Sequence, residues 1–373
     1  MAKIKKEKEV FSSESLKKEL ENFLFKSPET LEDGTIKTPR YETGIIMLDI
    51  LLNGGFPWGR VLGFGAEWGV GKTTLLIQAC GNIIEKYNKK VYYIDVEGGA
   101  TYELFEAMGY ANLLYHPKTN PDGKFFLLGI ETIQDISAVI KKVCQDEDTA
   151  IVVIDSDTDV VDGLALEEDD LGTSNKAVGI DARMWSKAAK VIKAVVKKSN
   201  ACLVIVHQAR VDLSGFMPKI VATGGNAMKH MASAEIWGKR KGWIAEGNII
   251  TKNKKEAIGA YVSLNTEKNR LTKPFSSVMV PIFFGKGVSN TWAYKEWLET
   301  HDTSDTATGE VIPIIKKKGA WYEISLPSGV FRAHGDSEVW KIILDNFDEI
   351  KKYVDGNGGF TTSEAEDTYI EED

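Results

Sequence analysis

The sequence predicts an α/β protein in which helices cover both faces of a mostly parallel central sheet. Runs rich in Val and Ile and of strand length recur along the chain as VLGFGA, VYYIDVE, AIVVIDS and CLVIVHQ. Continuous apolar runs of this kind are typical of strands that are buried on both faces. Each of the last three runs follows a helical segment, which is the order of elements in a β-α-β protein. Turn signals and alternation in residues 235–285 predict antiparallel strands that continue the sheet.

Residues 12–25, SSESLKKELENFLF, precede this core and predict a short amphipathic helix with a Ser start signal. The linker SPETLEDGTIKTP separates it from the core, so its apolar stripe needs another surface or another subunit. After the core, the segment WAYKEWLET, a hairpin at GAWYEISLPSGVF and a single helix at DSEVWKIILDNFDEIKKYV predict a small α+β domain. We therefore expect an N-terminal oligomerisation helix and linker at 1–39, the core at 40–290, the C-terminal α+β domain at 291–355 and a disordered acidic tail at 356–373.

The composition excludes several classes of protein. With 373 residues, 43% of them hydrophobic and 27% charged, the chain is an ordinary globular protein long enough for two domains. Its apolar runs are too short to cross a bilayer, and its charged N-terminus has no apolar signal region, so we expect a cytoplasmic protein. Cys80, Cys144 and Cys202 are too far apart for a disulfide framework or a zinc site, and we expect them to be buried.

The charge is unevenly distributed, so the net charge of −8 does not exclude a nucleic-acid partner. Residues 356–373 contribute −6 and residues 1–26 contribute +2, which leaves about −4 for the body of the protein. The acidic tail fits two interpretations, a solubilising end or a detachable competitor for a basic site.

The segment FGAEWGVGKTTLLIQAC, residues 64–80, lies where a predicted strand passes into a predicted helix. Gly69 and Gly71 let backbone N–H groups turn toward a phosphate. Lys72 supplies a charge for the β and γ oxygens, and Thr73 a hydroxyl for Mg²⁺. Ala66 stands where the usual spacing has its first glycine. The predicted nucleoside triphosphate site consists of Glu67, Trp68, Gly69, Val70, Gly71, Lys72, Thr73 and Thr74.

Carboxylates follow two other predicted strands. Asp155 ends AIVVIDS, where a carboxylate beside the phosphate loop can hold Mg²⁺ through its bound water. In VYYIDVE, we interpret Asp95 as structural, whereas Glu97 lies just past the strand end and can polarise the water that attacks the γ-phosphate.

Several further segments occur in a fixed order along some 280 residues, namely TGIIMLDILLNGGFPWGRV, the phosphate loop, YIDVE, IVVIDS, GIDARMWSKA, VIVHQARV, TGGNAMK, EKNRLTKPF and GAWY. In this order of segments the chain resembles the RecA recombinase family. Ala66, a poor match at residues 291–318, and His207 where bacterial members usually carry Asn depart from the pattern. Divergence of this kind is typical of a phage-encoded member of the UvsX type. The resemblance implies a RecA-type P-loop ATPase core that uses ATP and Mg²⁺.

Roles carried over by motif complete the expected ATP site. Glu97 resembles the family's water-activating glutamate, and Gln208 resembles the glutamine that senses the γ-phosphate. The alternative interpretation of Gln208 is a strand-end amide that caps backbone groups. Lys268 and Arg270 resemble the pair that reaches the nucleotide of the neighbouring subunit, and one residue between them on a strand makes them point the same way. Tyr102 is the nearest aromatic to the family's adenine-stacking position, where Leu104 aligns. We interpret His207 as a core histidine rather than a catalytic one.

Two predicted loops are candidates for binding DNA. The first, residues 162–183, is long enough to be functional, and Arg183 at the start of the next helix is its phosphate contact. The second, residues 210–225, combines cations for phosphates with apolar residues for unstacked bases. The candidate DNA-binding residues are Arg183, Arg210, Val211, Leu213, Phe216, Lys219, Gly224, Gly225 and Asn226.

The resemblance implies an ATP-dependent DNA recombinase, active in recombination, in repair of DNA damage and in phage replication. Its partners would be single-stranded DNA, double-stranded DNA, further copies of itself in a helical filament, and single-strand-binding and mediator proteins, with no membrane. A hexameric helicase or circadian-type ATPase with the same core is a rival, disfavoured because those proteins lack the GAWY domain and the TGGNA loop. A DNA-coating protein with weak ATPase, suggested by Ala66, is another.

Overall fold

The fold was obtained as a computed structural model that describes residues 29–30, 36–158, 160–161, 180–212, 219–222, 231–304 and 308–360. The chain divides into two compact units, residues 1–39 and 40–373. In the first unit, β1 (Glu29–Thr30) pairs with β2 (Ile36–Lys37) as a small antiparallel hairpin, within the predicted linker. The helix predicted at residues 12–25 lies outside the described residues.

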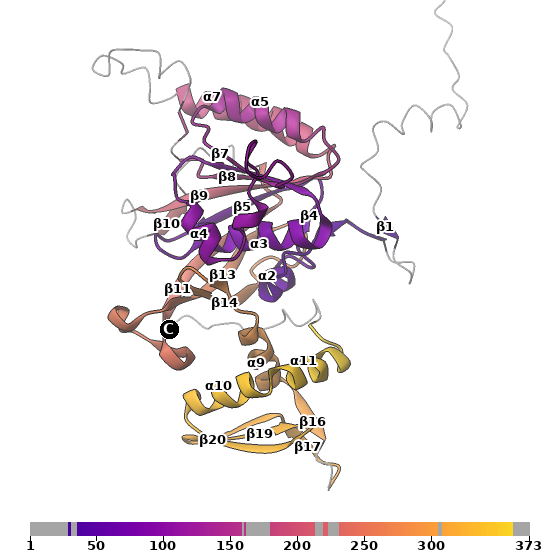
Figure 1. The fold of residues 1–373 in the computed structure, drawn as a ribbon, viewed down its shortest axis with the longest axis vertical. Helices are drawn as coiled ribbons and strands as arrows, with labels where there is room; N and C mark the ends of the chain where they lie inside the picture. Colours follow the sequence, from indigo (N-terminus) through magenta and orange to yellow (C-terminus); the bar gives the residue numbers. More distant parts are fainter. Residues whose placement is uncertain are drawn as a thin grey trace, which may run out of the picture. The chain divides into compact units, whose positions relative to one another are not determined.

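The second unit is built on one large mixed sheet (Figure 1). Its parallel strands lie in the order β11-β5-β9-β8-β6-β7, and β13, β14 and β15 continue it in antiparallel fashion. This confirms the predicted mostly parallel sheet. Its strands are β5 (Val61–Ala66), β6 (Lys90–Asp95), β7 (Phe125–Leu128), β8 (Thr149–Asp155), β9 (Cys202–Asp212), β10 (Lys219–Ala222), β11 (Ala234–Ala245), β12 (Ile249–Thr251), β13 (Gly259–Asn269), β14 (Ser277–Phe283) and β15 (Gly287–Val288).

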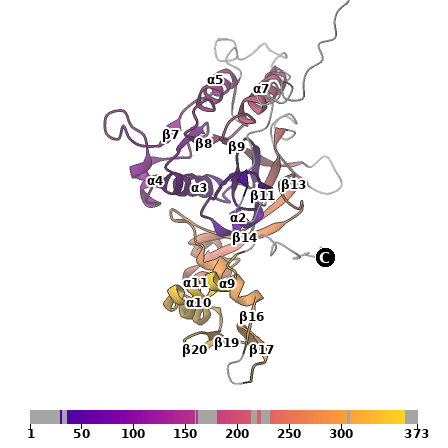
Figure 2. The same ribbon diagram turned by 90° about the vertical axis from the view of Figure 1, so that its right-hand side faces the viewer.

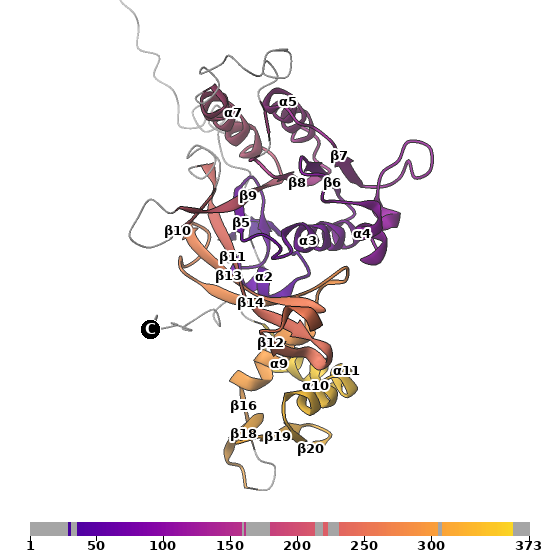
Figure 3. The same cartoon turned by 90° about the vertical axis from the view of Figure 1, so that its left-hand side faces the viewer.

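Alternate residues of the parallel strands point into two separate cores. Ile151 and Val153 of β8 face the side covered by α2 and α3, whereas Val152 and Ile154 face the side covered by α5 and α7. This follows from the two-residue period of a strand. Figures 1 and 3 show α5 and α7 side by side on one face, and Figure 2 shows α3 on the other. The helices and remaining short elements of this part are α2 (Ile46–Leu51), α3 (Lys72–Tyr87), α4 (Tyr102–Ala107), α5 (Ile133–Val143), α7 (Ile180–Val196), the 3-10 turns η1 (Ala111–Leu113), η3 (Glu246–Asn248) and η4 (Lys254–Glu256), and the pair β3 (Arg40–Tyr41) and β4 (Phe56–Pro57).

The C-terminal part has its own apolar core, in which Trp340 packs on Trp292 with ring centroids 4.5 Å apart. Its sheet strands, as predicted, include the hairpin of β19 and β20 (Figure 2). The single predicted helix is wrong, because the chain forms two helices that meet at Asn346, whose ψ of 21° departs from helical geometry. The elements are α9 (Thr291–Thr300), β16 (Asp302–Ser304), β17 (Val311–Pro313), β18 (Ile315–Lys318), β19 (Trp321–Leu326), β20 (Gly329–His334), α10 (Asp336–Asp345) and α11 (Phe347–Gly356).

The described chain ends on this core. Phe360 packs against Tyr294 at 5.0 Å between ring centroids, and the Gly359 carbonyl accepts a hydrogen bond from Trp297 Nε1 at 3.1 Å. Residues 361–373, most of the predicted tail, lie outside the described residues.

No helix among the described residues is long and apolar enough to cross a membrane. All three cysteines are buried, as expected.

Candidate nucleotide-binding site

The candidate phosphate loop connects β5 to α3 at the edge of the sheet where the parallel strands end. Gly69 and Gly71 adopt left-handed backbone angles, with φ of 71° and 93°. Gly71 ends the loop at the N-terminus of the 16-residue helix α3, whose first N–H groups have no helical partner and can bind an anion. A Cβ atom at Gly71 would lie 2.9 Å from the Ile282 side chain, so space as well as φ requires glycine there.

Packing explains the unusual glycine pattern at the start of this loop. Ala66 is paired with Gly238 of β11, and a Cβ on Gly238 would come within 3.0 Å of the Ala66 methyl group. The alanine is therefore accommodated by a glycine on the neighbouring strand. Gly65 is needed for a different reason, since a Cβ there would lie 2.5 Å from the Trp237 ring. Gly65 serves packing of the sheet.

Thr73 and Asp155, predicted to hold Mg²⁺, are neighbours. Thr73 Oγ1 donates a hydrogen bond to Asp155 Oδ2 at 2.9 Å, and the Tyr93 hydroxyl donates to the same oxygen at 2.5 Å. Burial raises the pKa of Asp155, an effect that these two hydrogen bonds oppose. Asp155 Oδ1 is buried without a hydrogen-bond partner. An orphaned carboxylate oxygen beside a threonine hydroxyl fits a nearby Mg²⁺ with its bound water.

The described residues contain no cluster of three acidic, His or Cys side chains that could hold a metal by themselves.

Glu97 and Gln208, which lie 111 residues apart in sequence, are in direct contact. Gln208 Nε2 donates a hydrogen bond to Glu97 Oε1 at 3.0 Å, from β9 to the loop after β6. Asp95 holds that loop in place by accepting hydrogen bonds from the backbone N–H groups of Gly98, Gly99 and Ala100 at 2.9–3.2 Å. The Glu97 side chain is exposed to solvent, and the hydrogen bond from Gln208 helps to position it. Asp95 therefore has a structural role, as interpreted from the sequence, and the Gln208 side chain lies against Glu97.

The remaining candidate residues of the nucleotide site differ in how far they are exposed to solvent. Glu67 is half-buried, Trp68 is 89% exposed, and Val70 is 2% exposed, so Val70 can offer a ligand only its backbone. Tyr102 is 58% exposed at the first position of α4, which Thr101 caps, whereas Leu104 packs against the core.

Next to Gln208 lies a buried cluster of ionisable side chains that the sequence did not predict. His207 Nδ1 is 2.8 Å from Asp157 Oδ2, and His207 Nε2 is 3.8 Å from Glu235 Oε2. Glu235 of β11 is paired with Gly63 of β5, whereas His207 of β9 is paired with Gly65, so the Glu235 side chain passes over Gly63 and reaches His207 diagonally across β5. A Cβ at Gly63 would lie 2.0 Å from the Glu235 carboxylate. His207 is thus a buried histidine with carboxylate neighbours, as interpreted, and not part of the phosphate loop.

Lys268 and Arg270 lie near one end of the sheet strands, and the phosphate loop follows the other end of β5. Lys268 is paired with Glu235, which is paired with Gly63 near the start of β5, whereas the loop begins after Ala66, about 10 Å further along that strand. Burial and the nearby Arg270 lower the pKa of Lys268, against the opposing effect of Glu235. The expectation that both lie on a strand is wrong in part, because β13 ends at Asn269 and Arg270 follows it.

Of the candidate DNA-binding residues, the structure describes only some. The predicted loop 210–225 is partly a hairpin, in which β9 continues to Asp212 and pairs with β10, placing Arg210 opposite Val221 and Val211 opposite Ile220. Lys219 begins β10. Arg183 lies within α7, which begins at Ile180, so the predicted first loop ends earlier than expected. Leu213, Phe216, Gly224, Gly225 and Asn226, like residues 162–179, lie outside the described residues.

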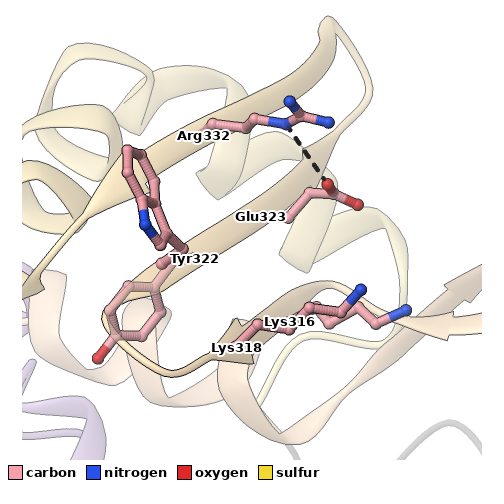
Figure 4. Close-up of a pocket in the computed structure, with 6 residues that line it drawn as sticks. Lys316, Lys318, Tyr322, Glu323 and Arg332 are labelled. Atoms are coloured by element: carbon pink, nitrogen blue, oxygen red, sulfur yellow. Dashed lines mark ion pairs between the residues drawn. The ribbon is translucent and has the colours of Figure 1, made fainter.

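A second concave site lies in the C-terminal part, on one face of the three-stranded sheet (Figure 4). It has a volume of about 370 Å³ and combines the exposed Trp321 with three cations, one of which, Arg332, lies 3.7 Å from Glu323. Its lining residues are Lys316, Lys318, Trp321, Tyr322, Glu323 and Arg332. It is separate from the nucleotide site.

Sequence reasoning missed Tyr93, Asp157 and Glu235. Tyr93 had a weak signal, because it lies two residues before Asp95 on the same face of a predicted strand. Asp157 and Glu235 had none, since a single acidic residue near a strand end is usually solvated.

The sequence is similar to those of several known proteins. Residues 29–289 match the RecA N-terminal domain family. Protein RecA of Trichodesmium erythraeum is 28% identical over 326 residues, covering 86% of this chain and 80% of that protein. Protein RecA of Xanthomonas campestris pv. campestris is 29% identical over 284 residues (75% and 74%), and that of Delftia acidovorans 27% over 282 residues (75% and 68%). A crystal structure of the RadB recombinase gives a TM-score of 0.46 at 22% identity, covering 66% of this chain and 98% of that one.

Proposed function

Because the chain belongs to the RecA family, we propose that it is an ATP-dependent DNA recombinase that assembles into helical filaments on single-stranded DNA and exchanges homologous strands. Hydrolysis of ATP with Mg²⁺ would be stimulated by DNA. The proposed partners are single-stranded and double-stranded DNA, further copies of the chain, and single-strand-binding and mediator proteins. A phage origin of the UvsX type stays a prediction.

The observation that carries this proposal is the 3.0 Å hydrogen bond between Gln208 and Glu97. The proposed role of Glu97 is to activate the attacking water, while Gln208 belongs to β9, whose far end forms the hairpin with β10 that carries Arg210, Val211 and Lys219. One strand therefore connects the proposed hydrolytic carboxylate to candidate DNA-binding residues. A γ-phosphate that competes for the Gln208 amide would break this contact, so ATP and DNA can favour the same state of β9.

The role of the bound nucleotide follows from the residues around it. Mg²⁺ and the phosphates supply the charge and the in-line phosphoryl group. Lys72 and the N–H groups at the start of α3 would bind the phosphates, and Thr73 and Asp155 would hold the magnesium and its water. Glu97 would accept the proton of the attacking water.

The geometry of Lys268 and Arg270 supports assembly of subunits head to tail. The two cations lie near the end of the strands opposite to the end that carries their own phosphate loop. A nucleotide that they reach therefore belongs to another copy of the chain. Contacts between different faces of identical subunits are heterologous, and they form rings or open helical filaments.

The test compares ADP release with and without single-stranded DNA, together with negative-stain images in the presence of a non-hydrolysable ATP analogue. We expect DNA-stimulated release and filaments. Rings without DNA stimulation would favour the helicase alternative, and DNA binding without ATP turnover would favour a coating protein.

Replacing Lys268 and Arg270 with Ala tests the head-to-tail arrangement. Nucleotide binding by dilute, DNA-free protein should persist, while cooperative ATPase and filaments should be lost, because the charges act on a neighbour. Alanine at the exposed Lys141 and Lys142 of α5 removes the same charge elsewhere and serves as the control. Loss of nucleotide binding in the dilute double variant would place the pair in its own subunit's site instead.

A further inference from the structure

Two large aromatic side chains of the described residues are almost fully exposed. Trp68, in the phosphate loop, is 89% exposed, and Phe275, in the loop between β13 and β14, is 82% exposed. Exposing a whole aromatic ring to water forgoes the large apolar burial that such a side chain can provide. Each ring can therefore gain that burial only by packing against a partner.

The backbone around Trp68 is anchored on both sides. The Glu67 N–H group donates a hydrogen bond to the Gly238 carbonyl at 3.3 Å, and the Val70 side chain is buried. Between these anchors, Gly69 faces open space, because a Cβ atom there would meet nothing within 4 Å beyond its chain neighbours. Trp68 is thus presented outward from a fixed loop.

Phe275 is presented in the same way, in a backbone conformation that is unfavourable for it. Its φ is 64°, in the left-handed region that bulky residues avoid. Its N–H group donates to the Thr266 carbonyl at 2.8 Å, and Asn269 Oδ1 accepts from the N–H groups of Leu271 and Thr272 at 2.9 and 3.1 Å. The loop is held by these bonds, so the exposed position of Phe275 is built into it.

Phe275 lies in the same loop as Arg270, and Lys268 lies just before that loop, near the end of β13. The three residues lie within eight positions of one another, and Phe275 is joined to Thr266, two residues before Lys268. When this loop brings its cations to the nucleotide of a neighbouring protomer, Phe275 arrives with them. The surface that it meets carries the phosphate loop, from which Trp68 projects four residues before Lys72.

We propose that Trp68 of one protomer packs against Phe275 of the next, forming an apolar rim around the nucleotide at the subunit interface. The inference rests on the proposed head-to-tail assembly and names a contact within it. Burying the two rings excludes water from the phosphates, which strengthens the charge interactions of Lys268 and Arg270 there. Aromatic pairs of this kind change an association constant by about 2- to 10-fold beyond their area.

Cross-linking tests the contact directly. The native cysteines Cys80, Cys144 and Cys202 are buried, so Trp68→Cys and Phe275→Cys introduce the reactive thiols. With ATP analogue, single-stranded DNA and a short bifunctional maleimide, we expect the double variant to give a ladder of oligomers. An equal mixture of the two single variants should stop at dimers, and each alone should give none.

The outcomes separate this contact from the proposed function. Filaments that are visible by microscopy but yield no cross-linked product would overturn the Trp68 and Phe275 contact and leave filament formation intact. Self-linking of either single variant would replace it with an isologous contact. Failure of the wild-type protein to form filaments at all would overturn the proposed function, and this contact with it.

A thermodynamic cycle gives a second, independent test. Trp68→Ala and Phe275→Gly should each raise the protein concentration needed for half-maximal assembly, and the double variant should be less impaired than the product of the two effects. Glycine adopts the φ of Phe275 freely, so that variant should fold at least as stably as the wild type. Trp321→Ala, at an aromatic that is 58% exposed in the C-terminal part, is the matched control and should leave assembly unchanged. Weaker nucleotide binding by dilute Trp68→Ala would instead place that ring on its own subunit's nucleotide, and purely multiplicative effects would refute the contact.

Discussion

Replacing Glu97 with Gln removes one charge at the proposed hydrolytic centre and little else. Glu97 is exposed and bonded to Gln208, and a glutamine of the same shape can still accept from that amide. Exposed substitutions usually change the free energy of unfolding by less than about 0.5 kcal/mol, so fold and nucleotide binding should persist. Loss of general-base help lowers turnover by about 10²- to 10⁴-fold, which corresponds to about 3 to 5 kcal/mol in activation free energy.

The assay measures ADP release with single-stranded DNA, alongside nucleotide affinity and thermal unfolding. Glu103→Gln removes an exposed carboxylate six residues further along, in the first turn of α4, and controls for the loss of charge. Turnover near the wild-type value in Glu97→Gln would refute the reasoning and assign the base elsewhere. A loss of turnover accompanied by lost nucleotide affinity would show that Glu97 acts in binding instead.

Three further predictions concern the stability of the core, two of them at the nucleotide site. Tyr93→Phe removes a buried donor to Asp155 and should destabilise the protein by about 1 to 3 kcal/mol in denaturant titrations while weakening Mg-ATP binding; unchanged values would contradict the Tyr93 assignment. Gly69→Ala should lower the free energy of unfolding by about 1 kcal/mol, because of its positive φ alone. Gly71→Ala should lower it by about 1 to 3 kcal/mol more, because its methyl group also meets the Ile282 side chain of β14. Equal losses in the two variants would refute the packing argument. Burial raises the pKa of Asp49 to about 6, so the stability that this carboxyl contributes is full below about pH 4 and is lost as the pH rises to about 6. Relative to Asp49→Asn, the free energy of unfolding of the wild type should fall by up to about 3 kcal/mol over that range. Parallel profiles of stability against pH for the two proteins would contradict this.

Local pattern was sufficient to locate the main buried strands of the sheet. The Val- and Ile-rich runs correspond to β5, β6, β8 and β9, because a strand buried on both faces must be apolar at every position. The phosphate loop was equally predictable, since its glycines, lysine and threonine are adjacent in sequence. In contrast, the break at Asn346 between α10 and α11 could not be predicted from a helical pattern that continues through it.

The main buried strands, the helix that follows the phosphate loop and the residues of that loop could be derived from sequence, because they depend on neighbours within a few positions. The meeting of distant residues could not. Folding brings Gln208 to Glu97, Tyr93 to Asp155, and Glu235 across Gly63 to His207, and it places Lys268 away from its own phosphate loop. These juxtapositions depend on the order and register of strands in the sheet, which are set by packing of the whole core and leave no mark at any single position.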